Sequence, residues 1–260
     1  MMFRKICTLF AICIFSLYAG LFLSLFYFFE GSLFLETLLY ERTLFSICLS
    51  LTAATITTVF SLFIAIPSAF ALSRYNFKGK SIVDLVLEIP MIVSPAALGA
   101  VLLIFFSNPI GRWMQDHSFQ IVFAPPGIIV AQFVTTAGIA TRLIKASMDE
   151  IPRKYEDVAC SLGASPVKAF FTITLPLSRK GIIAGAILTW AKALGEFGAT
   201  ITIAGSMAMK TETIPIAIFM SLSNADIEKT VILIFILIGI GLGMLYCARV
   251  LLKKVPFDWK

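Results

Sequence analysis

The stretch YEDVACSLGASPVKAFFTITLP, from Tyr155 to Pro176, is polar and charged, yet it lies between two long apolar stretches. The flanking stretches are long enough to cross a membrane, so this segment must project from a membrane surface. An ordered projection of this kind offers a binding surface to a partner outside the membrane.

Helix start and stop residues predict the form of this segment. Pro152 suits the first turn of a helix that runs to about Leu162, and Gly163 permits the left-handed turn that ends it. Ser165 is a candidate N-cap with Pro166 at the first helical position, which starts a second short helix toward Phe171. Pro176 is expected to close the segment before the next span. We therefore predict a helix-turn-helix elbow with apolar anchors at Val158, Leu162, Phe170 and Phe171.

Composition places the whole chain among membrane proteins. Of its 260 residues, 59% are hydrophobic and 14% are charged, and the mean hydropathy is +0.95. Six stretches approach or exceed the roughly 20 apolar residues that a transmembrane helix needs. We expect an all-α membrane protein with a single transmembrane domain, residues 1–260, and a cytoplasmic loop at 149–180. The six spans are predicted at about 6–29, 44–72, 82–106, 126–148, 181–204 and 230–248.

The first apolar stretch could be confused with a secretory signal, because Arg4 and Lys5 precede it. Its apolar run is longer than a signal-peptide core of about 7–15 residues, and no clear cleavage site follows. We expect a retained span.

The distribution of charge orients the chain. Most of the 21 basic residues fall in segments that are cytoplasmic if both termini are cytoplasmic, whereas the predicted outer loops hold only Arg42, Arg112, Lys210 and Lys229. The positive-inside rule therefore places both termini in the cytoplasm. The net charge of +6 follows from this bias and does not indicate nucleic-acid binding.

One apolar segment, TETIPIAIFMSLS from Thr211 to Ser223, is too short to span. We predict a short helix at the outer surface, with Thr213 as N-cap and Pro215 in the first turn. An ordinary surface loop is the alternative.

Other site classes find little support in the sequence. The five cysteines have no CxxC spacing, and His117 is the single histidine, so neither a zinc site nor histidine acid-base chemistry is expected. Gly79-Lys80-Ser81 resembles the end of a phosphate-binding loop, but Arg74 stands where the first glycine is needed.

The predicted fifth span carries two charges, Lys192 and Glu196, which cost roughly 2.5–3.5 kcal/mol each at the centre of a membrane helix. They lie four residues apart on one helix face, so we predict a neutralising pair beside a transport path; a buried packing pair is the alternative. Thr200 and Thr202 could present hydroxyls to an ion. Pro67, Pro90 and Pro95 allow kinks in the second and third spans. The path residues of this hypothesis are Lys192, Gly195, Glu196, Gly198 and Thr200, where the glycines permit close helix approach or flexibility.

The elbow resembles the cytoplasmic loop of the binding-protein-dependent ABC importer permeases, whose pattern is EAA, three residues, Gly, nine residues and I-x-L-P. Asp157-Val158-Ala159, Gly163 and Ile173-Thr174-Leu175-Pro176 stand at these spacings, with Asp157 in place of Glu, Val158 in place of the first Ala, and Glu156 one residue earlier. The resemblance implies a type I importer permease fold and a coupling helix seated on a separate ATPase subunit. It assigns ATPase coupling to Glu156, Asp157, Ala159, Leu162, Gly163, Ser165, Pro166, Leu175 and Pro176.

Further motifs resemble the molybdate/tungstate branch of these permeases, with sulfate permeases as the second choice. They are Ile89-Pro90 with Ser94-Pro95, Phe123 to Pro126, ALGEFGAT from Ala193 to Thr200, and KTETIPIAIF from Lys210 to Phe219. The resemblance implies a homodimer in the cell membrane, two ATPase subunits that bind ATP and Mg, and an extracytoplasmic solute-binding protein that delivers the oxyanion. This chain itself would bind no cofactor and would not be an enzyme.

Three other classes remain as alternatives. An ATP-independent secondary transporter would have no use for the elbow. A membrane-embedded enzyme would need a nucleophile with a base, or a ligand cluster, and neither is visible. A structural anchor would not need the Lys192 and Glu196 pair.

Overall fold

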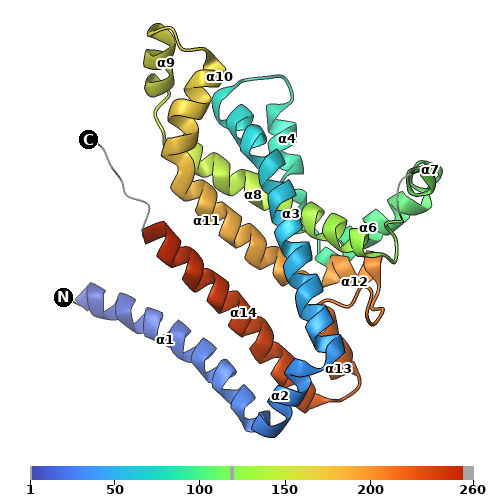
Figure 1. Cartoon of the computed structure of the whole chain (residues 1–260). Coiled ribbons are helices and arrows are strands. Elements are labelled where there is room, and N and C mark those ends of the chain that lie inside the picture. Colours follow the sequence, from blue (N-terminus) through green and yellow to red (C-terminus); the bar gives the residue numbers. More distant parts are fainter. Residues whose placement is uncertain (1, 118–119, 254–260) are drawn as a thin grey trace.

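The computed structural model describes residues 2–117 and 120–253, and all regular structure in these two ranges is helical (Figure 1). The prediction of an all-α membrane protein is confirmed. The elements are α1 (Met2–Ser24), η1 (Leu25–Phe28), α2 (Gly31–Leu39), α3 (Glu41–Arg74), α4 (Lys80–Val86), α5 (Ile89–Ile92), α6 (Pro95–Ser107), α7 (Pro109–His117), α8 (Pro125–Asp149), α9 (Lys154–Ser161), α10 (Pro166–Ala169), η2 (Phe170–Thr174), α11 (Leu175–Leu194), α12 (Gly198–Ala204), α13 (Ile214–Ser223) and α14 (Ile227–Lys253).

Five helical stretches of the described chain are long and apolar enough to cross a membrane, or six if a bent pair of helices counts as one span. The bent pair is the predicted third span, which is not one straight helix. Its two parts, Lys80–Ile92 and Pro95–Ser107, meet at an angle of 113°. Ser94 ends the first part because Pro95 disfavours helical backbone before it, and the Ser94 hydroxyl then accepts from Ala97 N at 3.3 Å to cap α6.

The predicted fifth span differs at both ends. Its helix begins much earlier than residue 181, because α10, η2 and α11 run on from Pro166 to Leu194. Pro176 therefore lies inside this helical stretch and does not close the loop. The π-helical turn η2 directly precedes it and accommodates a proline that has no N–H to donate. At the other end the helix stops at Leu194, and α12 begins only at Gly198.

The centre of the molecule is the contact of α3 with α8, where small and hydroxyl side chains let the two helices approach closely. Thr57 Oγ1 donates to Gln132 Oε1 at 3.0 Å, and the Ser61 and Thr136 hydroxyls lie 3.3 Å apart. Buried residues of this contact are Ala53, Thr57, Ser61, Ala65 and Ala69 on α3, and Ile128, Gln132, Thr136, Ala140 and Ile144 on α8.

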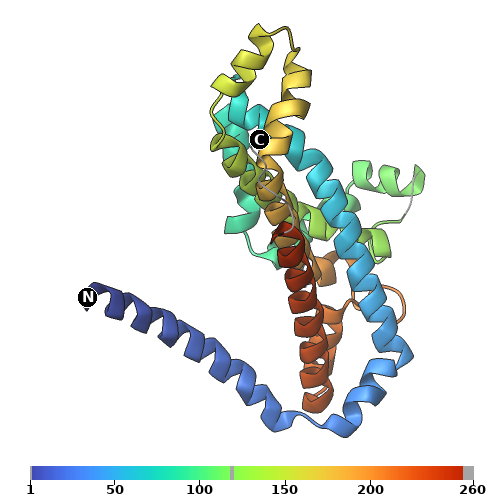
Figure 2. The same cartoon turned by 60° about the vertical axis from the view of Figure 1, so that its left-hand side comes forward.

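α1 stands away from the helical body in Figure 2, and its described side chains are almost all exposed. A helix that is apolar all round suits contact with lipid. The chain joins the body after α1, at η1, where the rings of Phe26 and the following Phe29 contact Phe235 of α14 with centroids 5.0 and 5.3 Å apart.

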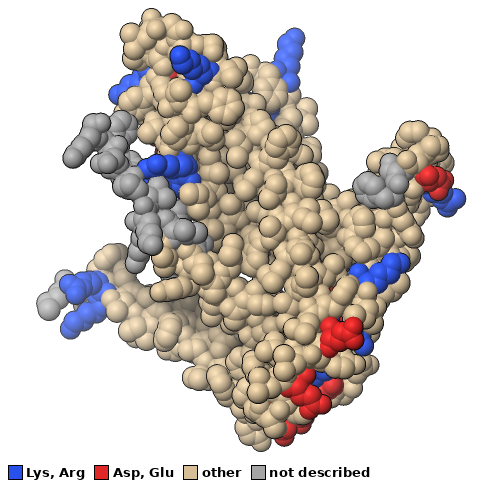
Figure 3. All heavy atoms as spheres, viewed as in Figure 1, with Lys and Arg blue, Asp and Glu red and all other residues tan. Residues whose placement is uncertain are grey.

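The charges divide between the two ends of the molecule. In the view of Figure 3, Asp and Glu gather at the end formed by α2 and the α13–α14 connection, while Lys and Arg are prominent at the end of α9 and α10 and near the chain termini. If the bent pair counts as one span, the elbow and both ends of the described chain fall on the same, basic side, which the positive-inside rule identifies as cytoplasmic.

The short apolar segment after residue 210 forms α13, with Pro215 in its first turn. The prediction of a short helix is therefore confirmed, and the alternative of an ordinary surface loop is not. It is not superficial. Ile214, Pro215, Ile216 and Ala217 are buried against α3 and α14, and Ile214 N donates to Ser50 Oγ at 2.8 Å. Thr213 takes the N-cap position, but its hydroxyl makes no capping bond.

Candidate coupling hairpin and membrane path

The elbow is a helical hairpin formed by α9, a tight turn and α10 with η2; we call it the coupling hairpin, residues 154–174. Gly163 has φ +91°, and the turn is a Schellman motif in which Gly163 N donates to Cys160 O and Ala164 N donates to Ala159 O, both at 3.0 Å. Ser165 Oγ accepts from Lys168 N at 3.2 Å as an N-cap. The predicted turn and restart are confirmed, although α9 begins at Lys154, two residues after Pro152.

The outer surface of the coupling hairpin is apolar and uncovered. Val158, Leu162 and Phe171 are exposed, Leu162 to 85%, whereas Phe170 turns inward against α3. A groove of about 590 Å³ lies between the limbs and is lined by Val158, Leu162, Ile173 and Pro176 among others. Exposed leucine and phenylalanine on a projecting element are typical of a protein-binding surface.

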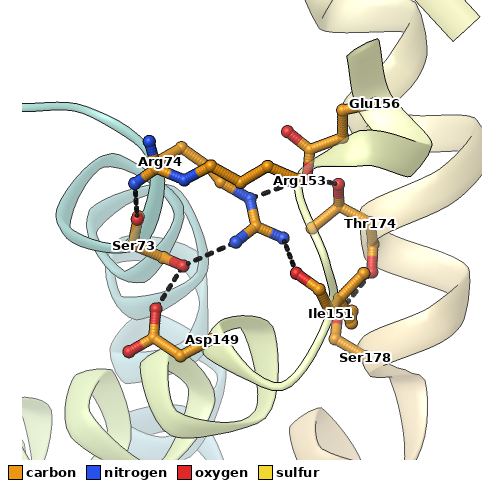
Figure 4. Close-up of polar contacts among 8 residues, drawn as sticks. All are labelled: Ser73, Arg74, Asp149, Ile151, Arg153, Glu156, Thr174 and Ser178. Carbon is orange, nitrogen blue, oxygen red and sulfur yellow. Dashed lines mark hydrogen bonds and ion pairs between the residues drawn. The ribbon is translucent and has the colours of Figure 1, made fainter. Parts of the chain in front are cut away.

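The two carboxylates of α9 have different surroundings. Asp157 is exposed, as a residue that contacts a partner must be. Glu156 is engaged inside the chain, where Oε1 accepts from Arg74 Nε at 2.7 Å and from Thr174 Oγ1 at 2.6 Å (Figure 4). Glu156 therefore stabilises the base of the hairpin, where the hairpin meets the end of α3, and does not contribute to its exposed surface as Asp157 does.

The polar cluster at this base was missed by sequence reasoning. Besides Glu156 and Thr174 it contains Arg74 and Ser73 at the end of α3, Asp149 at the end of α8, and Arg153 (Figure 4). The charge distribution along the sequence indicates only that Arg74 and Arg153 are basic residues on the cytoplasmic side. Their partners are some 80 residues away in the chain, so the sequence pattern holds no signal for the contacts.

In the membrane region, Lys192 Nζ lies 3.3 Å from Glu196 Oε2, which is the predicted pair. The two side chains differ in burial: that of Lys192 is 45% exposed and that of Glu196 only 1%. Glu196 Oε1 also accepts from Ala199 N at 3.1 Å, so the carboxylate caps the start of α12. The pair thus holds α12 to the end of α11 across the break at residues 195–197.

The remaining path residues lie around this break. Gly195 ends α11, and Gly198 opens α12 where a Cβ would come within 2.9 Å of Ala96 N, so only glycine lets α12 approach α6 this closely. Thr200 is fully buried and its hydroxyl has no hydrogen-bond partner among the described residues. Thr202, by contrast, donates to Gly198 O at 2.7 Å.

A helical bundle with several candidate spans, an exposed projecting hairpin and a charge pair at a break in a span is the arrangement expected of a membrane permease. Comparison with known proteins is consistent with this class. The family model "Binding-protein-dependent transport system inner membrane component" matches residues 59–255, and the chain belongs to this family. It is accordingly an integral membrane permease subunit of an ABC importer, a transport component and not an enzyme.

Relatives give the same family, and solved structures show the same fold. The molybdenum transport system permease protein ModB of Haemophilus influenzae is 37% identical over 187 residues, covering 71% of this chain and 82% of the relative. The sulfate transport system permease protein CysW of Escherichia coli K12 is 34% identical over 187 residues, covering 71% and 64%. The fold is similar to a bacterial alginate ABC transporter in complex with its pentasaccharide-bound periplasmic protein, with TM-score 0.74, 17% identity, and 95% and 91% of the two chains covered.

Proposed function

We propose that two copies of this chain form the path by which an ABC importer admits molybdate or tungstate. The choice of substrate rests on the similarity to ModB, which extends over 82% of that permease, and on the motifs ALGEFGAT and KTETIPIAIF. Each motif contains buried polar residues, among them Glu196 and Thr200 in the first and Glu212 in the second. Sulfate is the second candidate, because CysW is 34% identical.

The homodimer is supported by the Lys192 side chain. It is 45% exposed in the single chain while its partner Glu196 is buried. An ammonium group that faces lipid is costly, so this surface needs a second protein or a water-filled path beside it. A two-fold dimer supplies both, since each copy lines half of a central path. Lipid surrounds the outer faces of the spans.

Coupling to ATP is supported by the coupling hairpin. Its exposed Leu162, Val158 and Phe171 suit insertion into a groove of an ATPase subunit, with Asp157 at the edge of the contact. Two hairpins would engage two ATPase subunits, which bind the ATP and Mg. A solute-binding protein delivers the oxyanion at the opposite, outer face.

The test reconstitutes the chain in proteoliposomes with its ATPase and solute-binding protein, and measures ATP-dependent uptake of molybdate, tungstate and sulfate separately. Uptake of the group VI oxyanions in preference to sulfate is expected. Preferred sulfate uptake would establish the second candidate, and uptake without ATP would indicate a secondary transporter. Gly163→Pro provides the coupling control, because proline cannot adopt φ +91°; ATPase co-purification should be lost with it.

A further inference from the structure

Arg74 is buried at the cytoplasmic end of α3, with only 9% of the residue exposed. Arginine is almost never this buried unless its guanidinium is fully paired. Here Nε donates to Glu156 Oε1 at 2.7 Å, Nη2 to Ile151 O at 3.0 Å and Nη1 to Ser73 Oγ at 3.1 Å. One side chain thus connects α3 to α9 and to the α8–α9 connection (Figure 4).

The same carboxylate oxygen extends the connection to the second limb of the coupling hairpin. Thr174 is fully buried at the end of η2, and its hydroxyl donates to Glu156 Oε1 at 2.6 Å. Arg153 at the start of α9 donates to Ser73 O at 2.7 Å. The first limb of the hairpin is therefore fixed directly to the last residues of α3, and the second limb is fixed to them through Glu156. All these bonds are charge-assisted, and such hydrogen bonds are about twice as strong as neutral ones.

An apolar contact supports the polar one. The rings of Phe70 on α3 and Phe170 on the hairpin lie 4.6 Å apart, and Phe170 packs on the cluster that contains Ala65 and Ala69. Phe70, Ser73 and Arg74 all follow Pro67, the one proline inside α3. Pro67 has no N–H for the hydrogen bond to the preceding turn, so α3 bends most easily there.

We infer that Arg74 is a positioning residue for transport, which transmits movement of the coupling hairpin to α3 and bends it at Pro67. The inference rests on the proposed docking of the hairpin on an ATPase. Through the chain itself the hairpin is joined only to α8 and α11. Arg74 adds an ion pair to α3, the helix that packs along α8 in the membrane, and the contacts of Arg153 and Phe170 support this link.

The experiment uses the reconstituted complex and measures the number of ATP molecules hydrolysed per oxyanion imported. The main variant is Arg74→Met with Glu156→Gln. Removing both partners of a buried ion pair is often nearly neutral for stability, whereas removing one leaves an uncompensated charge. Arg74→Lys keeps the positive charge but loses the planar guanidinium, whose three nitrogen atoms each donate a hydrogen bond here. Thr174→Val removes one hydroxyl only. Arg142→Gln with Glu88→Gln neutralises the more exposed pair of α8 and α5 as the matched control.

We expect ATPase subunits to co-purify with the double variant while the ATP-to-oxyanion ratio rises at least about fivefold, with Arg74→Lys and Thr174→Val between it and the wild type. The Arg142 and Glu88 control should stay within about twofold of the wild-type ratio. A purely structural role would lower the yield of complex and leave the ratio unchanged. The inference is wrong if assembled complexes of the double variant keep the wild-type ATP-to-oxyanion ratio. If the double variant does not assemble, the same result from both Arg74→Lys and Thr174→Val overturns the inference. Absence of ATPase from the wild-type preparation would instead contradict the proposed docking.

Discussion

Replacing the two members of the Lys192 and Glu196 pair should have unequal effects on stability. Lys192→Met leaves Glu196, which is 1% exposed, without its cation. Breaking a buried pair by removing one partner costs about 3–5 kcal/mol, and we take about 3 kcal/mol because the lysine is half-exposed. Glu196→Gln leaves Lys192 free to hydrate, since its side chain is 45% exposed. The amide oxygen of glutamine can still accept from Ala199 N, so about 1 kcal/mol is lost.

The assay is thermal unfolding of the purified permease followed by tryptophan fluorescence. Trp190 is a suitable reporter, because it is buried two residues from Lys192 and donates from Nε1 to Thr55 Oγ1 at 3.1 Å. At about 2–4 °C per kcal/mol, Lys192→Met should lower Tm by roughly 6–12 °C and Glu196→Gln by roughly 2–4 °C. Lys168→Met, an exposed change on the hairpin, should leave Tm within about 1 °C.

An equal loss from both variants, or a larger loss from Glu196→Gln, would refute the account, because the prediction depends on which side chain is buried. Transport is measured on the same preparations and divided by the amount of folded protein. Wild-type transport by both variants would remove the pair from the path and leave it a packing contact only.

Three further changes test other parts of the structure. Leu162→Asp should abolish ATPase co-purification and leave the Tm of the permease unchanged, because Leu162 is 85% exposed and contributes little to folding; retained ATPase would contradict the docking surface. Thr200→Val should raise stability by about 1 kcal/mol in thermal unfolding, because it removes a buried hydroxyl without a partner, and it should lower oxyanion uptake if that hydroxyl serves the path. Gly138→Ala should destabilise by roughly 1–3 kcal/mol in thermal unfolding, since its Cβ would lie 2.4 Å from Leu87 O and push the end of α4 from α8; Gly239→Ala, with open space around it, is the control that should not be destabilised by a clash.

The turn of the coupling hairpin was predictable because its chemistry is local. Gly163 and Ser165 act through hydrogen bonds to residues three to five positions away, so residue type and spacing contain nearly all the information. Ser94-Pro95 carries the same N-cap and proline signal that correctly located Ser165-Pro166. The hydropathy of the whole stretch nevertheless favours a single kinked span, which is what we predicted. The structure has a break there because the local N-cap and proline outweigh the average hydropathy.

The contacts of Arg74 and Glu196 illustrate what the sequence does not contain. The Lys192 and Glu196 pair could be predicted because four residues on a helix place the charges together. The second bond of Glu196, to Ala199 N, depends on a helix break that hydropathy does not show. Arg74 finds Glu156 only because α3, α8 and the hairpin converge in three dimensions, and that convergence depends on many small side chains between α3 and α8.

α3 is fixed by an arginine near each end, which has a consequence for how the two membrane faces communicate. Its 34 residues span about 50 Å, more than the hydrocarbon core. At the outer end Arg42 makes a bidentate contact of 2.6 and 2.9 Å with buried Glu212, which lies in the segment between α12 and α13. At the cytoplasmic end Arg74 binds Glu156 of the hairpin. A bend at Pro67 therefore changes the angle between two anchored ends, and the segment that carries Glu212 must follow α3 or release Arg42. If the hairpin moves α3 as we propose, that movement reaches the segment that carries Glu212 through one helix.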